Sequence, residues 1–179
     1  MKIVIINGKG GCGKDTLVSM CRDILGDELV HNISTVDFIK EIATRCGWDG
    51  TKTPENRKFL SDLKDLLTEW NDIPLKRVIE EVDAYCSYLT INQIWNNGVA
   101  FIHCREPKEI DRLKEALYDY DVTTLLIHRP AAEEIEQINH ADNEVFNYVY
   151  DYTIWNDKNL SWLYNEAKVF LRDYLKFNI

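Results

Sequence analysis

The sequence lacks three features that would each point to a particular class of protein. No run approaches the roughly eighteen apolar residues of a membrane-spanning helix, so we expect no membrane span. The five cysteines are scattered without a C-x-x-C pair, and the first residues have no signal-peptide architecture, so we expect reduced thiols in a cytoplasmic protein. Positive charge is scarce, with 21 Lys and Arg against 30 Asp and Glu and a net charge of −9. Because such a chain repels polyphosphate backbones, broad DNA or RNA binding is not expected.

What the sequence does contain is a glycine-rich loop between an apolar run and a helical pattern. The run Ile3-Val4-Ile5-Ile6 precedes the motif G-x-x-x-x-G-K, and residues 14–25 follow with apolar side chains at helical spacing. Glycine lets the loop turn its backbone N–H groups toward a phosphate, and the positive end of the helix and a lysine add to the attraction. The sequence therefore predicts that a nucleoside triphosphate binds to this loop. Its binding residues are Gly8, Gly10, Gly11, Cys12, Gly13, Lys14, Asp15 and Thr16.

Three residues of the loop each admit two interpretations. Asp15 stands where a Ser or Thr normally places its hydroxyl on Mg²⁺. Its carboxylate either binds Mg²⁺, directly or through water, or only complements the positive end of the helix. Thr16 either donates to an α-phosphate or is structural, and Cys12 is either an oxidisable thiol or, as we favour, a small space-filling residue.

Strands and helices alternate along the chain, which we treat as one domain, residues 1–179. We expect strands at 2–7, 28–33, 99–104, 122–127 and 152–155, and helices at 14–25, 34–46, from 54, 74–96, from 107 and at the C-terminus. This alternation predicts an α/β fold, a five-stranded parallel sheet flanked by helices on both faces. Ligands bind at the carboxyl ends of such strands, so we expect the polar residues found there to lie close together. They are Asp37, His103, Arg105, Arg129, Asn156 and Asp157.

This order of segments resembles that of the P-loop kinases of small phosphorylated metabolites. Within them it is most similar to the deoxynucleoside monophosphate kinases of phages, with phosphomevalonate kinase as a related group. The matching residues are Gly13-Lys14-Asp15-Thr16, Ile39-Lys40, Arg57, Arg105 with Glu109, Ile127-His128-Arg129-Pro130 and the segment from Tyr152 to Asp157. The resemblance implies a three-layer P-loop NTPase fold of the nucleoside-kinase type.

The resemblance also implies an activity, the transfer of the γ-phosphoryl group of ATP, with Mg²⁺, to a small phosphorylated acceptor. That acceptor would be a (deoxy)nucleoside monophosphate bound by an inserted helical part at about 54–96, and a lid-like segment would lie at about 131–149. The metal would bind at Asp15. The implied catalytic residues are Lys14, Arg105 and Arg129, the acceptor residues are Asp37, Lys40, Arg57 and Arg105, and the backbone near Asn156 and Asp157 would contact adenine. No membrane or nucleic-acid partner is implied, and the oligomeric state stays open.

Two departures from that family keep a second function open, a nucleotide-binding regulatory protein with weak or no transfer activity. The third strand ends in His103-Cys104, where the family has an Asp that binds Mg²⁺ through water. The lid-like segment contains no Arg or Lys. Plainer interpretations also stand beside several of the site residues. Arg57 and Lys40 are solvated charges, Asp37 is a helix cap paired with Ser34, His103 is a hydrogen-bonded buried histidine, and the helical aromatic residues Trp70, Trp162 and Tyr164 belong to the core.

Overall fold

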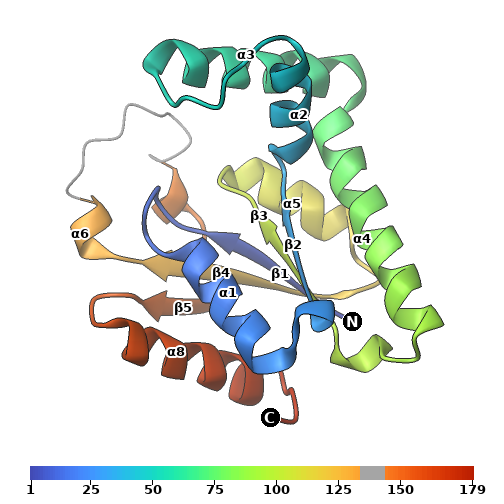
Figure 1. Cartoon of the computed structure of the whole chain (residues 1–179), viewed down its shortest axis with the longest axis vertical. Helices are drawn as coiled ribbons and strands as arrows, with labels where there is room; N and C mark the ends of the chain where they lie inside the picture. The colour runs from blue at the N-terminus through green and yellow to red at the C-terminus, as the bar shows by residue number, and fades with distance from the viewer. Residues whose placement is uncertain (134–143) are drawn as a thin grey trace.

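The computed structural model describes residues 1–133 and 144–179, and its centre is a five-stranded parallel sheet (Figure 1). The strands are β1 (Lys2–Asn7), β2 (Val30–Ser34), β3 (Val99–His103), β4 (Asp121–His128) and β5 (Tyr152–Trp155). Their order across the sheet is β2-β3-β1-β4-β5, and every neighbouring pair is parallel. The predicted parallel sheet is therefore confirmed, and β1 at its centre delivers the glycine-rich loop to the carboxyl edge.

Helices form a layer on each face of this sheet. The helices are α1 (Lys14–Leu25), α2 (Asp37–Arg45), α3 (Pro54–Asn71), α4 (Ile73–Ile91), α5 (Pro107–Ala116), α6 (Pro130–Glu133) and α8 (Leu160–Val169). Helices α1 and α8 pack on one face, and α4 and α5 contribute to the apolar cluster on the other. Helices α2 and α3 lie beyond the carboxyl ends of the strands, with α3 along the top of the molecule (Figure 1). No helix in the described part of the chain is long and apolar enough to cross a membrane.

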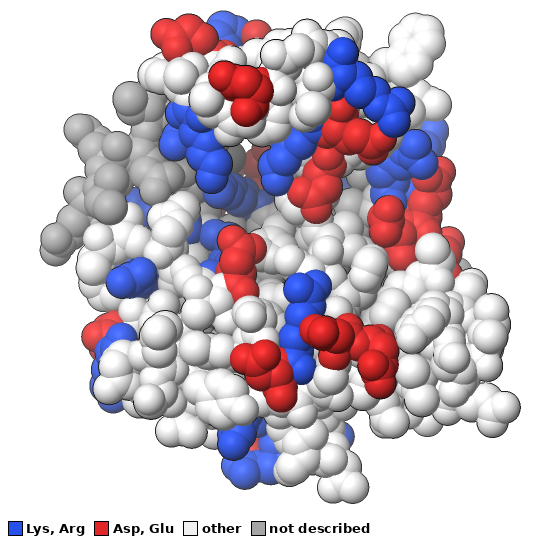
Figure 2. Space-filling view, viewed as in Figure 1, with Lys and Arg blue, Asp and Glu red and all other residues white. Residues whose placement is uncertain are grey.

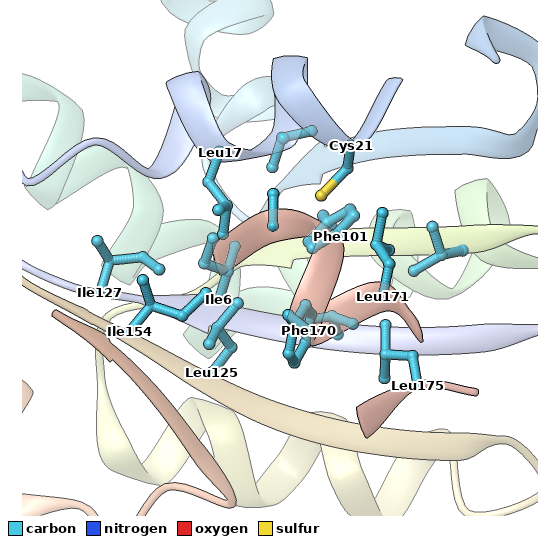
Figure 3. Packing of buried hydrophobic residues seen from close by; sticks show 14 of the residues in the cluster. Ile6, Leu17, Cys21, Phe101, Leu125, Ile127, Ile154, Phe170, Leu171 and Leu175 are labelled. Atoms are coloured by element: carbon cyan, nitrogen blue, oxygen red, sulfur yellow. The ribbon is translucent and has the colours of Figure 1, made fainter. Parts of the chain in front are cut away.

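The apolar run of β1 is explained by this three-layer arrangement. Val4 and Ile6 belong to the cluster beneath α1 and α8, whereas Ile3 and Ile5 belong to the cluster on the opposite face. Figure 3 shows the first cluster, in which Ile6 lies among side chains from α1, α8 and the neighbouring strands. Because both faces of a parallel strand are covered, each residue of the run loses its contact with water, and no alternation with polar residues is required.

The structure corrects the prediction that Trp70 belongs to the core. Its side chain is 80% exposed, and α3 has no buried residue. The helical stripe was recognised, but α3 packs against α2 and α4 rather than against the sheet, so part of the stripe faces solvent. Trp162 and Tyr164 are half-buried, with Trp162 packed against the core cluster.

Other boundaries differ by a few residues. Helix α4 ends at Ile91 rather than near 96, because Asn92 and Gln93 leave the helical path, with Gln93 at a positive φ. The second strand begins at Val30, after a short 3₁₀ turn, Asp27–Leu29. Most of the predicted lid-like segment lies outside the described residues, which resume at 144 with a 3₁₀ turn, Val145–Asn147.

Candidate nucleotide and phosphoryl-transfer site

Left-handed glycines form the loop between β1 and α1. Gly8, Gly11 and Gly13 have positive φ angles. The requirement is strictest at the two ends of the loop. A Cβ atom on Gly8 would lie 2.5 Å from both Cys12 Sγ and Ile127 O, and one on Gly13 would lie 2.5 Å from Asn156 Nδ2. The surrounding atoms therefore lie so close to the two ends of the loop that a side chain larger than that of glycine does not fit there.

Lys14 closes the loop from the first turn of α1. Its Nζ donates to Gly8 O at 2.5 Å and to Lys9 O at 3.0 Å, so the ammonium group lies over the backbone that the sequence predicts to hold phosphates. Cys12 is buried beneath it, with Sγ 3.6 Å from Lys14 Nζ, and burial raises the pKa of the thiol. Cys12 is therefore a neutral packing residue, as we favoured.

Asp15, the residue after Lys14, presents its carboxylate to solvent. The side chain is 92% exposed, and Oδ1 lies 3.7 Å from His103 Nε2 at the end of β3. His103 itself is largely buried, and its Nε2 lies 2.8 Å from Asn32 Oδ1. Burial lowers the pKa of His103 to about 4, so the imidazole is neutral near pH 7. The structure thus confirms a hydrogen-bonded histidine and places it near the first turn of α1, at the carboxyl edge where the sequence predicted it.

The donor set at this position suits a magnesium ion that is carried by a nucleotide. Among the described residues, no group of three His, Cys, Asp or Glu side chains could hold a metal by itself. Mg²⁺ usually keeps several waters and takes one or two carboxylates together with phosphate oxygens. Asp15 offers one such hard oxygen beside the loop, whereas the neutral His103 does not replace a second carboxylate.

Two arginines follow strands that end beside this loop. Arg129 follows β4, and its Nη1 donates to Gly11 O at 3.1 Å. Arg105 follows β3, and its backbone carbonyl accepts from Asn7 Nδ2 at 3.0 Å, one residue before the loop. Of the three residues predicted to be catalytic, Lys14 and Arg129 therefore contact the loop through their side chains, whereas Arg105 is held near its start by its backbone.

A cavity of about 570 Å³ opens next to the loop, between the start of α1 and the start of α8. Its lining residues are Gly13, Thr16, Arg129, Asn156, Lys158, Asn159, Leu160, Ser161 and Leu163. This volume lies in the range of small-ligand pockets. The side chain of Asn156 also supports the loop from beneath, because Nδ2 donates to Cys12 O at 2.8 Å. Asp157 is exposed and is not among the lining residues, so only Asn156 of the predicted pair borders the cavity.

The residues predicted to bind the acceptor make contacts of a more local kind. Asp37 Oδ2 accepts from Ser34 N at 2.9 Å, as the predicted pair requires, and Asp37 Oδ1 pairs with Lys40 Nζ at 3.0 Å. Ser34 is not the helix cap, however, because α2 begins at Asp37 and its N-cap is Val36. Arg57 is exposed in the first turn of α3, where its Nε donates to Lys52 O at 3.2 Å. Figure 2 shows a hollow beneath the α3 end of the molecule, with Lys and Arg side chains along its rim.

Ion pairs join this helical part to the start of α5. Lys64, on α3, donates to Glu106 Oε1 at 2.5 Å, and its side chain is largely buried. Asp72, between α3 and α4, pairs with Arg112, which also binds Glu109 at 2.8 Å. The first connection ends at Glu106, the N-cap of α5, and the second at Arg112 within α5, so both tie this helical part to the segment after Arg105.

Comparison with known proteins gives the fold. No family model matches the sequence, and no curated protein matches it. Among solved structures, a sugar kinase from Janibacter sp. HTCC2649 shares 16% identity and a TM-score of 0.53, covering 98% of this chain and 96% of its own. Dephospho-CoA kinase from Campylobacter jejuni shares 13% identity and a TM-score of 0.50 over 100% of both chains. This chain has a P-loop kinase fold. At such low identity the likeness extends to the fold alone.

Sequence reasoning missed Asn7, a polar side chain that joins several parts of this site. It is fully buried at the end of β1, where its amide contacts the loop, Arg105 and Tyr150. A polar residue that ends an apolar run directly before Gly8 was a usable signal, but its partners lie far along the chain.

Proposed function

We propose that this chain is an ATP-dependent kinase that transfers the γ-phosphoryl group to a small phosphorylated acceptor. The observation that carries the proposal is the contact of Lys14 and Arg129 with a left-handed glycine loop at a helix N-terminus, with the backbone of Arg105 bound to the residue before that loop. Phosphoryl transfer depends mainly on positioning and on positive charge around the transferring group. A cluster of cations on an otherwise acidic protein meets that requirement locally.

Each residue of the loop has a separate task in this proposal. Backbone N–H groups at the start of α1 bind the phosphates, and Lys14 exchanges its carbonyl partners for phosphate oxygens. Arg129 approaches the transferring group from β4, while the nucleoside occupies the cavity beside Thr16 and Asn156. Asp15 would hold Mg²⁺, which neutralises negative charge on the phosphates. An oxygen of the acceptor phosphate forms the new bond to the γ-phosphorus, and the bond from that phosphorus to the bridging oxygen of ADP breaks, so that ADP leaves. Because the acceptor oxygen is already anionic, no strong base is needed.

We assign the acceptor to the hollow beneath α3, in the part of the chain at about 54–96 together with α2. Arg105 and Arg57 would hold its phosphate or base, and Lys40 and Asp37 would border it. Figure 2 shows Lys and Arg side chains around this hollow, with Asp and Glu side chains beside them. The Lys and Arg side chains could bind a phosphorylated acceptor, and the preferred candidate is a (deoxy)nucleoside monophosphate.

A coupled assay with ATP, Mg²⁺ and a panel of ribo- and deoxynucleoside monophosphates tests this function directly. We expect turnover with at least one acceptor and its loss in Lys14→Ala. Lys9→Ala is the matched control, because it removes a lysine from the same loop but keeps the carbonyl that Lys14 contacts. Absence of turnover with every monophosphate and with phosphomevalonate would refute the kinase proposal.

A second candidate, a nucleotide-binding regulatory protein with weak or no transfer activity, is favoured by one observation. The strand end beside Asp15 carries the neutral His103 rather than a second carboxylate. This candidate predicts that ATP raises the melting temperature while the transfer assay stays silent. A kinase shows both effects, so the pair of measurements separates the two functions.

A further inference from the structure

Asn7 is a polar residue in a place where the sequence and the fold otherwise require apolar ones. It ends the apolar strand β1 and is fully buried, directly before the first glycine of the loop. A buried amide without hydrogen bonds destabilises a fold by about 1–3 kcal/mol, so we expect this side chain to have hydrogen-bond partners.

The amide of Asn7 makes three hydrogen bonds, and each one leads to a different segment. Oδ1 accepts from Gly8 N at 2.7 Å, at the start of the phosphate loop. Nδ2 donates to Arg105 O at 3.0 Å, in the connection between β3 and α5. Nδ2 also donates to Tyr150 Oη at 2.7 Å, and that hydroxyl donates onward to Val145 O at 2.7 Å.

This set of partners is specific for asparagine. Reversal of the amide would set its NH₂ group against Gly8 N–H and its oxygen against Arg105 O, so only one orientation satisfies all the partners. Aspartate would keep the bond from Gly8 but has no hydrogen to donate to Arg105 O. An apolar residue of the same size would leave all of the partners without their bond.

We propose that Asn7 is a positioning residue that couples the nucleotide loop to Arg105 and to residues 144–150. The inference rests on the proposed function, in which Gly8 belongs to the nucleotide site and Arg105 to the acceptor site. A nucleotide that steadies Gly8 also steadies the amide of Asn7, and through it the backbone of Arg105. In this way the first ligand prepares the binding site of the second.

The chain offers a matched control for this branch point. Asp151, next to Tyr150, accepts from Thr124 N and from Thr124 Oγ1, each at 2.8 Å. Thr124 is fully buried in β4, so this contact anchors the same returning segment by a separate route. Thr124→Val removes the hydroxyl at nearly constant volume and leaves the three bonds of Asn7 in place.

Hydrogen–deuterium exchange with and without MgATP tests the coupling. In the unmodified chain we expect MgATP to slow exchange in the loop, and also at 104–106 and 144–150, by at least ~5-fold. Asn7→Ala should keep the slowing in the loop but lose it in both distant segments. Tyr150→Phe, which removes one hydroxyl only, should lose it at 144–150 and keep it at 104–106. Thr124→Val should keep all three effects.

The pattern of outcomes separates this inference from the proposed function. If MgATP slows no exchange in the loop, the proposed function fails, and the coupling fails with it. If MgATP slows exchange in the loop alone, nucleotide binding stands and the coupling is overturned. Equal losses in Thr124→Val and Asn7→Ala, or full slowing in both Asn7→Ala and Tyr150→Phe, overturn it as well. If Asn7→Ala does not fold, the split between the two segments in Tyr150→Phe decides.

Discussion

An added methyl group at Gly13 would disturb the glycine-rich loop, and the structure allows the resulting loss of stability to be estimated. Gly13 has a φ of +104°, and an added Cβ would lie 2.5 Å from Asn156 Nδ2, the atom that donates to Cys12 O. Left-handed backbone costs an L-residue about 1–2 kcal/mol. Displacement of the buried Asn156 amide adds about 1–3 kcal/mol, because donor and acceptor both lose their partner. We therefore expect Gly13→Ala to lower the free energy of unfolding by about 2–5 kcal/mol.

Gly11→Ala is the matched control, because it isolates the backbone cost. Gly11 has a φ of +77°, but an added Cβ would meet nothing within 4 Å. Its expected loss is only the strain, about 1–2 kcal/mol. Urea unfolding measures both variants, and each free energy of unfolding is compared with that of the unmodified chain.

A double-mutant cycle sharpens this test. Asn156→Ala removes the atom that the new methyl group would strike, so Gly13→Ala should cost only the backbone strain on that background. The coupling energy is expected to be about 1–3 kcal/mol. Equal losses for Gly13→Ala and Gly11→Ala, or strictly additive effects in the cycle, would refute the argument that Asn156 fixes the end of the loop.

Three further predictions concern the site and the core. Lys14→Ala should weaken MgATP binding by at least about 10-fold and remove most of the ATP-induced rise in melting temperature, as measured by thermal shift. Burial lowers the pKa of His103 from 6.5 to about 4. The neutral imidazole therefore contributes to stability above pH 6.5, and this contribution is lost as the pH falls toward 4. His103→Gln should flatten the decline of the free energy of unfolding across that interval, a change on the order of 1–3 kcal/mol, and an unchanged slope would contradict the burial argument. Trp70→Ser should change the free energy of unfolding by less than about 0.5 kcal/mol, whereas Phe170→Ala in the core should cost about 3–5 kcal/mol, both measured in urea.

The fold could be predicted from the sequence because its strongest signals are local. The apolar run of β1 needs no polar alternation, and Thr53-Pro54 marks the start of α3, where Thr53 accepts from Asn56 N as expected. The glycine loop is equally local, since a strand, a loop and a helix follow one another within residues 2–25. Such signals fix the elements and their type, and the alternation of types fixes the parallel sheet.

The site was predicted only in part, because its contacts depend on register across the sheet. His103 pairs with Ile6 on one side and with Ser34 on the other, and these registers bring it to Asp15 and Asn32. The sequence predicted that His103 lies at this edge, but no local pattern indicates these particular partners. The bonds of Asn7 join positions far apart in the chain for the same reason. The hydrophobic periodicity of α3 also could not predict which of its residues face solvent. A stripe identifies a helix, but it does not say which side of the stripe finds a neighbour.

Helix α3 packs at the surface of the molecule, so its sequence can change without a change in the core. None of its residues is buried, and it is held by its packing on α2 and α4 and by the contact of Lys64 with Glu106. The two apolar clusters that flank the sheet contain no residue of α3 among their buried members. If α3 borders the acceptor as proposed, we expect substitutions on its exposed face to change acceptor preference without a large loss of stability.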